Sequence, residues 1–366
     1  MRLLFDVVHP AHVHFFRHMR QQLIDDGHEA LVVSRDKDVT LALLDHFAIP
    51  HVCAGRAATG GVTARAGELA ARVSALVGHI RRFSPDVVAT RNPAGVQAAR
   101  LTRVPGVFDT DDGTAVGIHF RAARPFADVI TTPACLSEDF GAKHRRYPGF
   151  KALAYLHPNR FRPDGGIRDE LGLRPGEPLF AARFSAHSAS HDAKVKGLPA
   201  AAQRAVVEHL AQRGRVVVSG EERLPAGVAS LGLAVPPARF HDVLAAADLC
   251  VGDSQSVAAE AAVLGTPAYR LSSFSDRVDY LQVLEADYGL VRNFLPGDET
   301  AMLAAVARAT DDLPGLARAA ATRRRRLLSE GVDVTAWYCE LLTELAASRG
   351  ASRRRARKVP GRRHAR

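Results

Sequence analysis

The chain has few cysteines, and none of them are spaced as a metal-binding or redox pair. Its four cysteines, Cys53, Cys135, Cys250 and Cys339, lie far apart in a chain of 366 residues. Closely spaced cysteine pairs are the usual mark of a zinc site or a redox couple. Single scattered cysteines are more often small apolar core residues. We therefore expect a protein of a reducing cytoplasm.

Long apolar runs and the common glycine-rich nucleotide fingerprints are also absent from the sequence. No stretch approaches the roughly 20 consecutive apolar residues that a transmembrane helix needs. An acid and several histidines follow residues 1–5 too soon for a secretion signal. The Gly-x-Gly-x-x-Gly pattern does not follow the first predicted strand, and no P-loop sequence occurs. These absences argue against a membrane span and against a classical dinucleotide enzyme.

Aromatic residues are scarce, at 6% of the chain, whereas the formal net charge is +10. The positive charge is concentrated at one end, because nine basic residues and no acid lie between residues 349 and 366. The rest of the chain is close to neutral and lacks a basic stripe with interleaved aromatic residues, so we expect no specific nucleic-acid partner. This concentration of basic residues predicts that residues 349–366 form a disordered basic tail. Such a tail suits peripheral contact with an anionic membrane.

Short β-branched runs alternate with helical segments along most of the chain, which predicts two consecutive open α/β domains. The expected strands are Leu3–Val8, Ala30–Ser34, Asp86–Thr90, Gly106–Asp109 and Asp128–Thr132, then Leu179–Ala182, Val216–Ser219, Leu249–Gly252 and Ala268–Leu271. Proline and glycine interrupt the pattern between about residues 147 and 178. We expect domains at 1–155 and 156–330, then a closing helix at 331–348 that packs back towards the first domain. Two such domains place a ligand between the carboxyl ends of their sheets.

The most informative segment of the second domain runs from Asp248 to Pro267. A predicted strand ends at Gly252 and a helix begins near Ser256, so the turn presents backbone N–H groups at a helix N-terminus, which suits a phosphate. Glu260 lies about one turn further on, where its carboxylate can accept hydrogen bonds from ribose hydroxyls. The alternative is a helix cap followed by a surface acid. The nucleotide-binding candidates here are Gly252, Asp253, Ser254, Gln255, Ser256 and Glu260.

Cationic candidates follow two other strands of the second domain. Arg183 follows the first strand of the second domain, with His187 and His191 after it, and Arg270 comes just after a Gly-Thr-Pro sequence. Arg183 suits a diphosphate because a guanidinium makes bidentate, charge-assisted contacts with phosphate oxygens. A polar loop with a surface arginine is the alternative reading.

Three candidates come from the first domain. His12 follows the first strand at the expected cleft edge, where a neutral imidazole can take a proton from an acceptor hydroxyl. Asp109 and Asp111 close a later strand, whose end should also face the cleft. The alternatives are a polar group at a helix start and local hydrogen bonding in a turn. His12 and His14 diverge on a helix and no second ligand cluster is evident, so we expect no metal and no bound cofactor.

Two parts of the chain resemble known families. In the second domain, a strand, a small polar turn, a helix with Glu260 and the exit Gly265-Thr266-Pro267 follow one another as in the donor-binding segment of glycosyltransferase-B (GT-B) enzymes and UDP-N-acetylglucosamine 2-epimerases. The sequence from Asp6 to Phe16, with Gly27-His28-Glu29 and Tyr147-Pro148-Gly149, looks like an uncharacterised family of archaeal and bacterial GT-B-like proteins. This second resemblance extends to about residue 345, and Val8-His9 stands where that family usually has Thr-Asn.

The resemblance implies an α/β fold of GT-B architecture, with two Rossmann-like domains facing each other across a cleft. It implies that Asp109 or Asp111 in the first domain holds a sugar hydroxyl or moves a proton, and that Arg183 and His187 in the second contact the diphosphate. The expected function is metal-independent transfer of a sugar from a nucleotide-sugar, with UDP as the first choice of nucleotide, to a hydroxyl of a lipid-linked or polysaccharide acceptor. A nucleotide-sugar 2-epimerase is the alternative, and a catalytically inactive sugar-nucleotide-binding protein is a third. The expected location is the cytoplasm, with peripheral contact at the inner membrane face.

Overall fold

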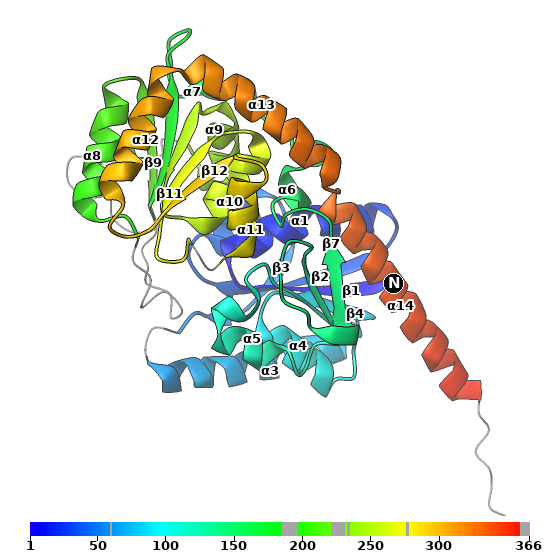
Figure 1. Cartoon of the computed structure of the whole chain (residues 1–366). Coiled ribbons are helices and arrows are strands. Elements are labelled where there is room, and N and C mark those ends of the chain that lie inside the picture. Colours follow the sequence, from blue (N-terminus) through cyan, green and yellow to red (C-terminus); the bar gives the residue numbers. More distant parts are fainter. Residues whose placement is uncertain (59–60, 185–196, 221–230, 233–234, 276–277, 359–366) are drawn as a thin grey trace, which may run out of the picture.

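The computed structural model describes residues 1–58, 61–184, 197–220, 231–232, 235–275 and 278–358. Within this part, the chain forms two α/β units, each built on a parallel sheet (Figure 1). The first sheet has seven strands in the order β3-β2-β1-β4-β5-β6-β7, and the second has five in the order β12-β11-β10-β8-β9. The expected α/β fold with two Rossmann-like units is confirmed.

The first unit carries the N-terminal strands and the helices that connect them. Its strands are β1 (Arg2–Val7), β2 (Glu29–Asp36), β3 (His51–Arg56), β4 (Val87–Thr90), β5 (Gly106–Asp109), β6 (Val129–Pro133) and β7 (His144–Tyr147). Its helices are α1 (Pro10–Asp25), α2 (Thr40–His46), α3 (Val62–Phe83), α4 (Pro93–Leu101) and α5 (Ile118–Ala123). The strand order reverses between β1 and β4, which places a crevice for ligands at their carboxyl ends.

The second unit follows two short connecting helices, α6 (Leu153–Leu156) and α7 (Ile167–Glu170). Its strands are β8 (Leu179–Phe184), β9 (Arg215–Gly220), β10 (Leu249–Gly252), β11 (Ala268–Leu271) and β12 (Val291–Phe294). Its helices are α8 (Ala200–Ala211), α9 (Phe240–Ala246), α10 (Gln255–Leu264), α11 (Asp279–Ala286), α12 (Glu299–Asp311) and α13 (Leu313–Glu330). Here the strand order reverses between β8 and β10.

A buried ion pair fixes the carboxyl end of β1. Asp6 is fully buried and pairs with Arg72 of α3, which is 4% exposed. Arg72 also donates to the carbonyl oxygens of Ser34 and Ala54, at the ends of β2 and β3, at 3.2 and 3.0 Å. The hydroxyl of Thr90, the last residue of β4, donates to the other Asp6 oxygen at 2.8 Å. One buried pair therefore ties together four strands at the edge that faces the crevice.

Gly252 allows β10 to approach β8 closely in the second sheet. Its φ is +155°, and a Cβ at this position would lie 1.9 Å from the carbonyl oxygen of Arg183. Any side chain here would push the two strands apart. The glycine therefore sets the start of the turn that leads into α10.

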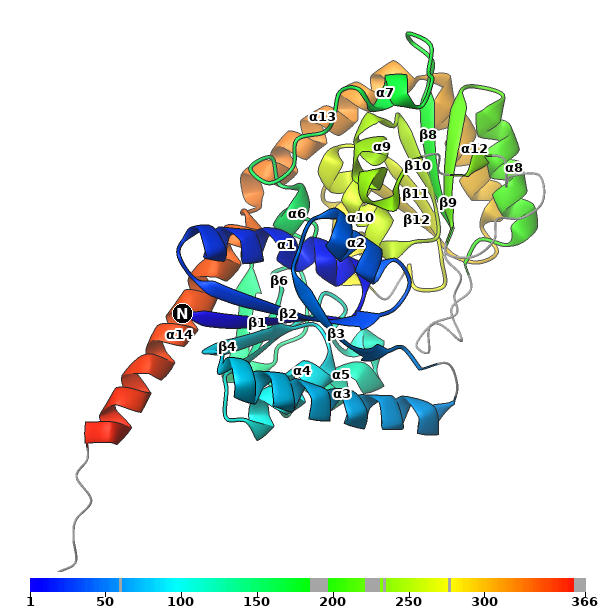
Figure 2. The ribbon, with the colours of Figure 1, turned by 180° about the vertical axis from the view of Figure 1, so that it is seen from behind.

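The last helix returns the chain to the first unit. Figures 1 and 2 show α13 passing along the second unit, and α14 (Val334–Lys358) continuing beside the first unit and projecting beyond it. Tyr338 and Leu342 of α14 are fully buried, and Arg349 donates to the backbone oxygens of Pro85, Asp86 and Arg103.

The sequence predicted a disordered tail from residue 349, but Arg349 is anchored and α14 continues to Lys358. The prediction missed the helix because it rested on charge and on the lack of apolar residues. Arginine and alanine, which make up much of 349–358, are strong helix formers. Residues 359–366 lie outside the described residues. No helix in the described part of the chain combines the length and apolar character needed to cross a membrane.

Candidate functional site

Two buried acids and two largely buried cations meet at the carboxyl edge of the first sheet. Arg91, the residue after β4, donates through Nη1 to Asp109 at the end of β5 and through Nη2 to Asp111 just beyond it. Lys151, which precedes α6, places its Nζ 2.5 Å from the other oxygen of Asp111. Both predicted acids therefore lie at the expected edge, but they are held in a network with two cations.

The network fixes the charge of Asp111. Burial favours the neutral form of a carboxyl group, but Lys151 and then Arg91 outweigh this effect and hold the pKa of Asp111 well below its ordinary value. Burial also disfavours the charged form of Arg91, but the carboxylate of Asp111 raises the pKa of Arg91 above its ordinary value. Asp111 is thus a permanent anion at neutral pH, suited to stabilising charge and poorly suited to accepting a proton.

His12 lies in the first turn of α1, beside this network. Burial, and next the charge of Arg91, lower the pKa of His12 well below its ordinary value, so the ring is neutral at pH 7. Its Nδ1 accepts a hydrogen bond from the backbone N–H of Val8 at 3.5 Å. That bond places the single proton of the neutral ring on Nε2. Nε2 is therefore a donor, which favours holding an acceptor oxygen over removing its proton.

The other half of the candidate site is the turn between β10 and α10. The hydroxyl of Ser254 caps α10 by accepting the N–H of Val257 at 3.4 Å. The first N–H groups of a helix have no partner within the helix, so the turn from Ser254 to Ser256 presents donors and a positive dipole end. The N–H of Asp253 donates instead to the carbonyl oxygen of Arg183 at 3.2 Å. Asp253 is buried, with its carboxylate accepting the N–H of Leu198 at 3.3 Å. Gln255 and Ser256 are only partly buried.

Arg270 brings a buried positive charge to the same turn. Its side chain is 1% exposed, and its Nε donates to the carbonyl oxygen of Asp253 at 3.3 Å. Nη1 donates to Ser275 at 3.0 Å, whereas Nη2 has no hydrogen-bond partner among the described residues. Burial lowers the pKa of Arg270 to about 10, so it remains charged at neutral pH. A buried cationic donor without a partner is costly unless a ligand satisfies it.

Arg183 lies at the end of β8, next to β10, where its Nη1 donates to the hydroxyl of Ser219 at 2.8 Å. The remaining predicted candidate of this loop, His187, lies outside the described residues, as does His191.

Glu260 does not lie on an open surface. It is 6% exposed, and its carboxylate accepts the hydroxyl of Tyr155 at 2.6 Å and lies 3.4 Å from Nε2 of His241. Burial tends to raise the pKa of this carboxyl group, but His241 and Tyr155 hold it below the ordinary value. The acid therefore reaches from α10 to α6 and α9 and helps to join the two units.

His14 completes this buried contact between the units. Its ring packs against His241 with centroids 4.6 Å apart and against Tyr155 at 5.6 Å. Its Nδ1 has no hydrogen-bond partner among the described residues. Burial, and next the nearby His241 and Arg17, lower the pKa of His14 well below its ordinary value.

The lowered pKa of His14 predicts a loss of stability in acid. The folded protein resists a proton that the unfolded chain accepts near pH 6.5, so stability is intact above that pH and falls below it. Between pH 7.5 and 5.5, the free energy of unfolding should fall by about 1.4 kcal/mol less in His14→Phe than in wild type. Urea unfolding at both pH values measures this difference, and equal losses in the two proteins would contradict it.

A narrow cavity joins the two halves of the site. Its volume is about 10 Å³, which is room for one water molecule. It is lined by residues of both units, Asp111, Phe150, Lys151, Ala152, Tyr155, Ser256, Ala259 and Tyr280. Asp111 and Lys151 of the first network thus face Ser256 in the first turn of α10. In the described part of the chain, no group of three or more histidine, cysteine or acidic side chains is arranged to hold a metal ion.

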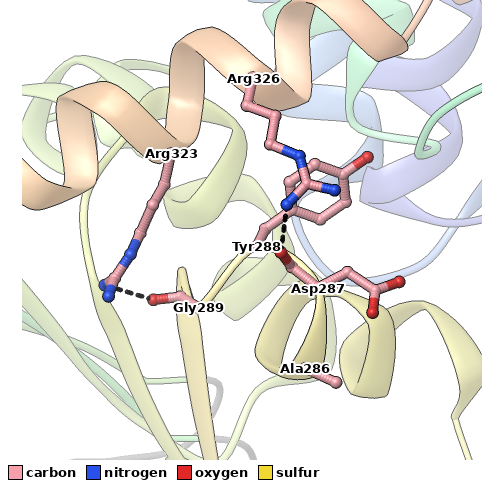
Figure 3. Close-up of a pocket in the computed structure, with 6 residues that line it drawn as sticks. All are labelled: Ala286, Asp287, Tyr288, Gly289, Arg323 and Arg326. Carbon is pink, nitrogen blue, oxygen red and sulfur yellow. Dashed lines mark hydrogen bonds between the residues drawn. The ribbon is translucent and has the colours of Figure 1, made fainter.

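A larger surface cavity of about 290 Å³ lies between α13 and the end of α11 (Figure 3). The two arginines that line it donate hydrogen bonds to backbone carbonyl oxygens just after α11. Arg323 donates to Gly289 and Arg326 to Asp287, each at 2.9 Å. These contacts compensate the negative end of α11, and no residue of the network around Asp111 lines this cavity. We assign no ligand to it.

Sequence reasoning missed five side chains of this region: Arg91, Lys151, Tyr155, His241 and Tyr338. Arg91 carried a usable signal, because it follows a predicted strand whose carboxyl end faces the cleft. Lys151 and Tyr155 lie in the segment read as a linker, and His241 lies in the first turn of α9. Their contacts depend on how the two units pack, which no local pattern reveals.

A model of the family described as "Protein of unknown function (DUF354)" matches residues 1–281. No curated protein matches the chain.

Several solved structures share the fold at low sequence identity. UDP-GlcNAc 2-epimerase from Neisseria meningitidis, bound to UDP-GlcNAc, has a TM-score of 0.64 at 11% identity over 95% of this chain and 100% of that one. MnaA of S. aureus, in a co-structure with UDP, has a TM-score of 0.64 at 15% identity over 92% and 94%. The glycosyltransferase VinC, in complex with dTDP, has a TM-score of 0.63 at 15% identity over 95% and 100%. These likenesses show the GT-B fold.

Proposed function

We propose that this chain, which belongs to the family described as "Protein of unknown function (DUF354)", binds a nucleotide-sugar between its units. It then transfers the sugar to a hydroxyl acceptor. The observation that carries this proposal is the cavity in which Asp111 and Lys151 of one unit face Ser256 of the other. Structural neighbours described as bound to UDP-GlcNAc, UDP or dTDP support a nucleotide ligand, with UDP as the first choice.

The second unit would hold the donor. Its diphosphate would lie at the N-terminus of α10, where Nη2 of Arg270 supplies a buried cationic donor. Arg183, at the neighbouring strand end, adds a second cation. The charge that develops on the leaving diphosphate would fall on these fixed donors, so the proposal needs no metal ion. The sugar would then extend towards Asp111 and Lys151.

The first unit would hold the acceptor. Nε2 of His12 is placed to donate to an acceptor oxygen, because its Nδ1 is taken by the N–H of Val8. As the acceptor oxygen bonds to the anomeric carbon, the bond to the diphosphate would break and the acceptor proton would pass to the leaving diphosphate oxygen. The anions Asp109 and Asp111 would stabilise the positive charge that develops at the anomeric carbon. The 10 Å³ cavity is far below the several hundred cubic ångströms of a typical ligand site. Binding of a nucleotide-sugar therefore requires the two units to move apart.

An epimerase-like reaction is the second candidate function. The concentration of ionisable groups around Asp111, which includes Lys151 and His12, favours it, because epimerisation needs several groups that move or stabilise protons. Incubating the full-length protein with UDP-, GDP-, dTDP- and CMP-sugars in the absence of acceptor distinguishes the two. A new sugar epimer indicates epimerisation, whereas product that forms only with an added alcohol indicates transfer. Lack of binding to every nucleotide-sugar in a thermal-shift screen would refute both functions, and binding without turnover would indicate an inactive binding protein.

We also propose that the basic C-terminal segment attracts the protein to an anionic membrane on the cytoplasmic side, where a lipid-linked acceptor would lie. Each basic residue near such a surface contributes about 1 kcal/mol. Removing residues 350–366 keeps the anchored Arg349, so we expect an unchanged melting temperature and weaker binding to anionic liposomes at low salt. Neutral liposomes are the control. Equal binding to both kinds of liposome by the full-length chain would contradict the proposal.

A further inference from the structure

The C-terminal helix contributes a side chain to the charged network of the first unit. Tyr338 of α14 is fully buried, and its hydroxyl donates to Oδ1 of Asp109 at 2.5 Å. The same hydroxyl contacts that of Thr131, which itself donates to Oδ1 of Asp109 at 3.0 Å. Tyr338 lies more than 200 residues from Asp109 in the sequence and beyond residue 281, where the family match ends.

These contacts form a continuous chain from α14 to the interdomain cavity. Tyr338 holds one oxygen of Asp109, and Arg91 holds the other oxygen. Arg91 then bridges to Asp111, which pairs with Lys151 at the cavity wall. The guanidinium of Arg91 is planar and binds both Asp109 and Asp111. Fixing the carboxylate of Asp109 therefore fixes the plane of the guanidinium, and with it the direction in which Arg91 contacts Asp111.

We propose that Tyr338 is a positioning residue that orients Asp109, and through Arg91 fixes Asp111 and Lys151 where they face the bound sugar. The expected effect on turnover rests on the proposed function. The orientation of Asp109 and Arg91 by Tyr338 does not, because it is a property of the protein without ligand. The role is one of orientation only, because burial raises the pKa of Tyr338 far above its ordinary value and keeps the hydroxyl protonated.

The ring of Tyr338 has a separate packing role that a test must leave intact. It packs against Phe15 with centroids 5.3 Å apart and against Trp337 at 5.2 Å. Tyr338→Phe keeps this packing and removes only the hydroxyl. The matched control is Tyr147→Phe in the same aromatic cluster, with centroids 6.0 Å from Tyr338. Tyr147 is also fully buried, but its hydroxyl has no hydrogen-bond partner among the described residues.

The first readout needs no substrate. A guanidinium clamped by two carboxylates rotates slowly about its Nε–Cζ bond, so its Nη protons give separate NMR signals at low temperature. We expect such signals for Arg91, assigned with Arg91→Lys, in wild type and in Tyr147→Phe. In Tyr338→Phe they should broaden or merge. Unchanged Arg91 signals in Tyr338→Phe would overturn the inference whether or not the protein proves to be a transferase.

The second readout uses turnover of the nucleotide-sugar identified for the wild-type protein. We expect Tyr338→Phe to lower kcat by about tenfold, the lower end of the loss seen when a group that orients a metal ligand is removed, with little change in KM for the nucleotide-sugar. KM should change little because the nucleotide part of the donor is held by the other unit. Tyr147→Phe should keep wild-type kcat. Equal losses in both variants, or a rise in KM without a fall in kcat, would show a packing role and overturn the inference. If wild type binds no nucleotide-sugar, the proposed function fails while the NMR result still decides the positioning role.

Discussion

Replacing His12 with alanine should lower turnover by roughly 10²-fold, because the acceptor oxygen would no longer be held in position for attack on the anomeric carbon. The ring lies in the first turn of α1 beside Arg91, and its lowered pKa keeps it neutral. Its Nδ1 accepts a hydrogen bond from the N–H of Val8. The ring proton therefore lies on Nε2, which would donate a hydrogen bond to the acceptor oxygen. Donor affinity, measured by calorimetry, should stay nearly unchanged because the donor is held by the other unit.

A second variant separates the two roles open to His12. Glutamine can place an N–H near the position of Nε2, but its amide cannot accept a proton at neutral pH. If His12 orients the acceptor, His12→Gln should recover part of the activity that His12→Ala loses. If His12 is instead a general base, both variants should lose 10²- to 10⁴-fold. Wild-type turnover in His12→Ala would remove this residue from the mechanism.

The fold could be predicted from the sequence because its central strands are apolar and flanked by clear helical periodicity. Strands β1, β4 and β10 lie where buried runs indicated them. Three strands were missed, and all are at the edges of the two sheets, β3, β7 and β12. Edge strands face solvent and carry polar residues such as those of β7, His144-Arg145-Arg146. Their sequences therefore lack the apolar signal that marks a central strand.

The candidate site could be predicted only where a residue follows a strand of its own unit. Asp109 and Asp111 were found in this way, since carboxyl ends of parallel strands share one edge. Lys151 and Tyr338 reach the same network from a connecting segment and from the last helix. Their position depends on packing between elements distant in sequence, which periodicity does not encode. The pairing of Glu260 with Tyr155 was missed for the same reason, because it forms across the junction of the two units.

Glu260→Gln should weaken binding of UDP or a UDP-sugar by roughly 10- to 150-fold, the range expected for lost hydrogen bonds to a charged group. Ser256 and Glu260 lie four residues apart on α10, hence on one face of the helix. With the diphosphate at the start of α10, the ribose would come within reach of this carboxylate. The contacts with Tyr155 and His241 leave acceptor capacity, because a carboxylate offers about four lone-pair sites.

The same contacts demand a control, since a change at Glu260 also disturbs the junction of the two units. Tyr155→Phe removes one hydrogen bond from the junction but leaves the charge of Glu260 in place. If Glu260 binds ribose, calorimetric titration of UDP should show a much larger loss for Glu260→Gln than for Tyr155→Phe, and Glu260→Ala should lose at least as much as Glu260→Gln. Equal losses in Glu260→Gln and Tyr155→Phe would assign Glu260 to the junction alone. Binding as tight as wild type in both Glu260 variants would mean that the donor lies elsewhere, because no other acid on α10 can replace the lost contact.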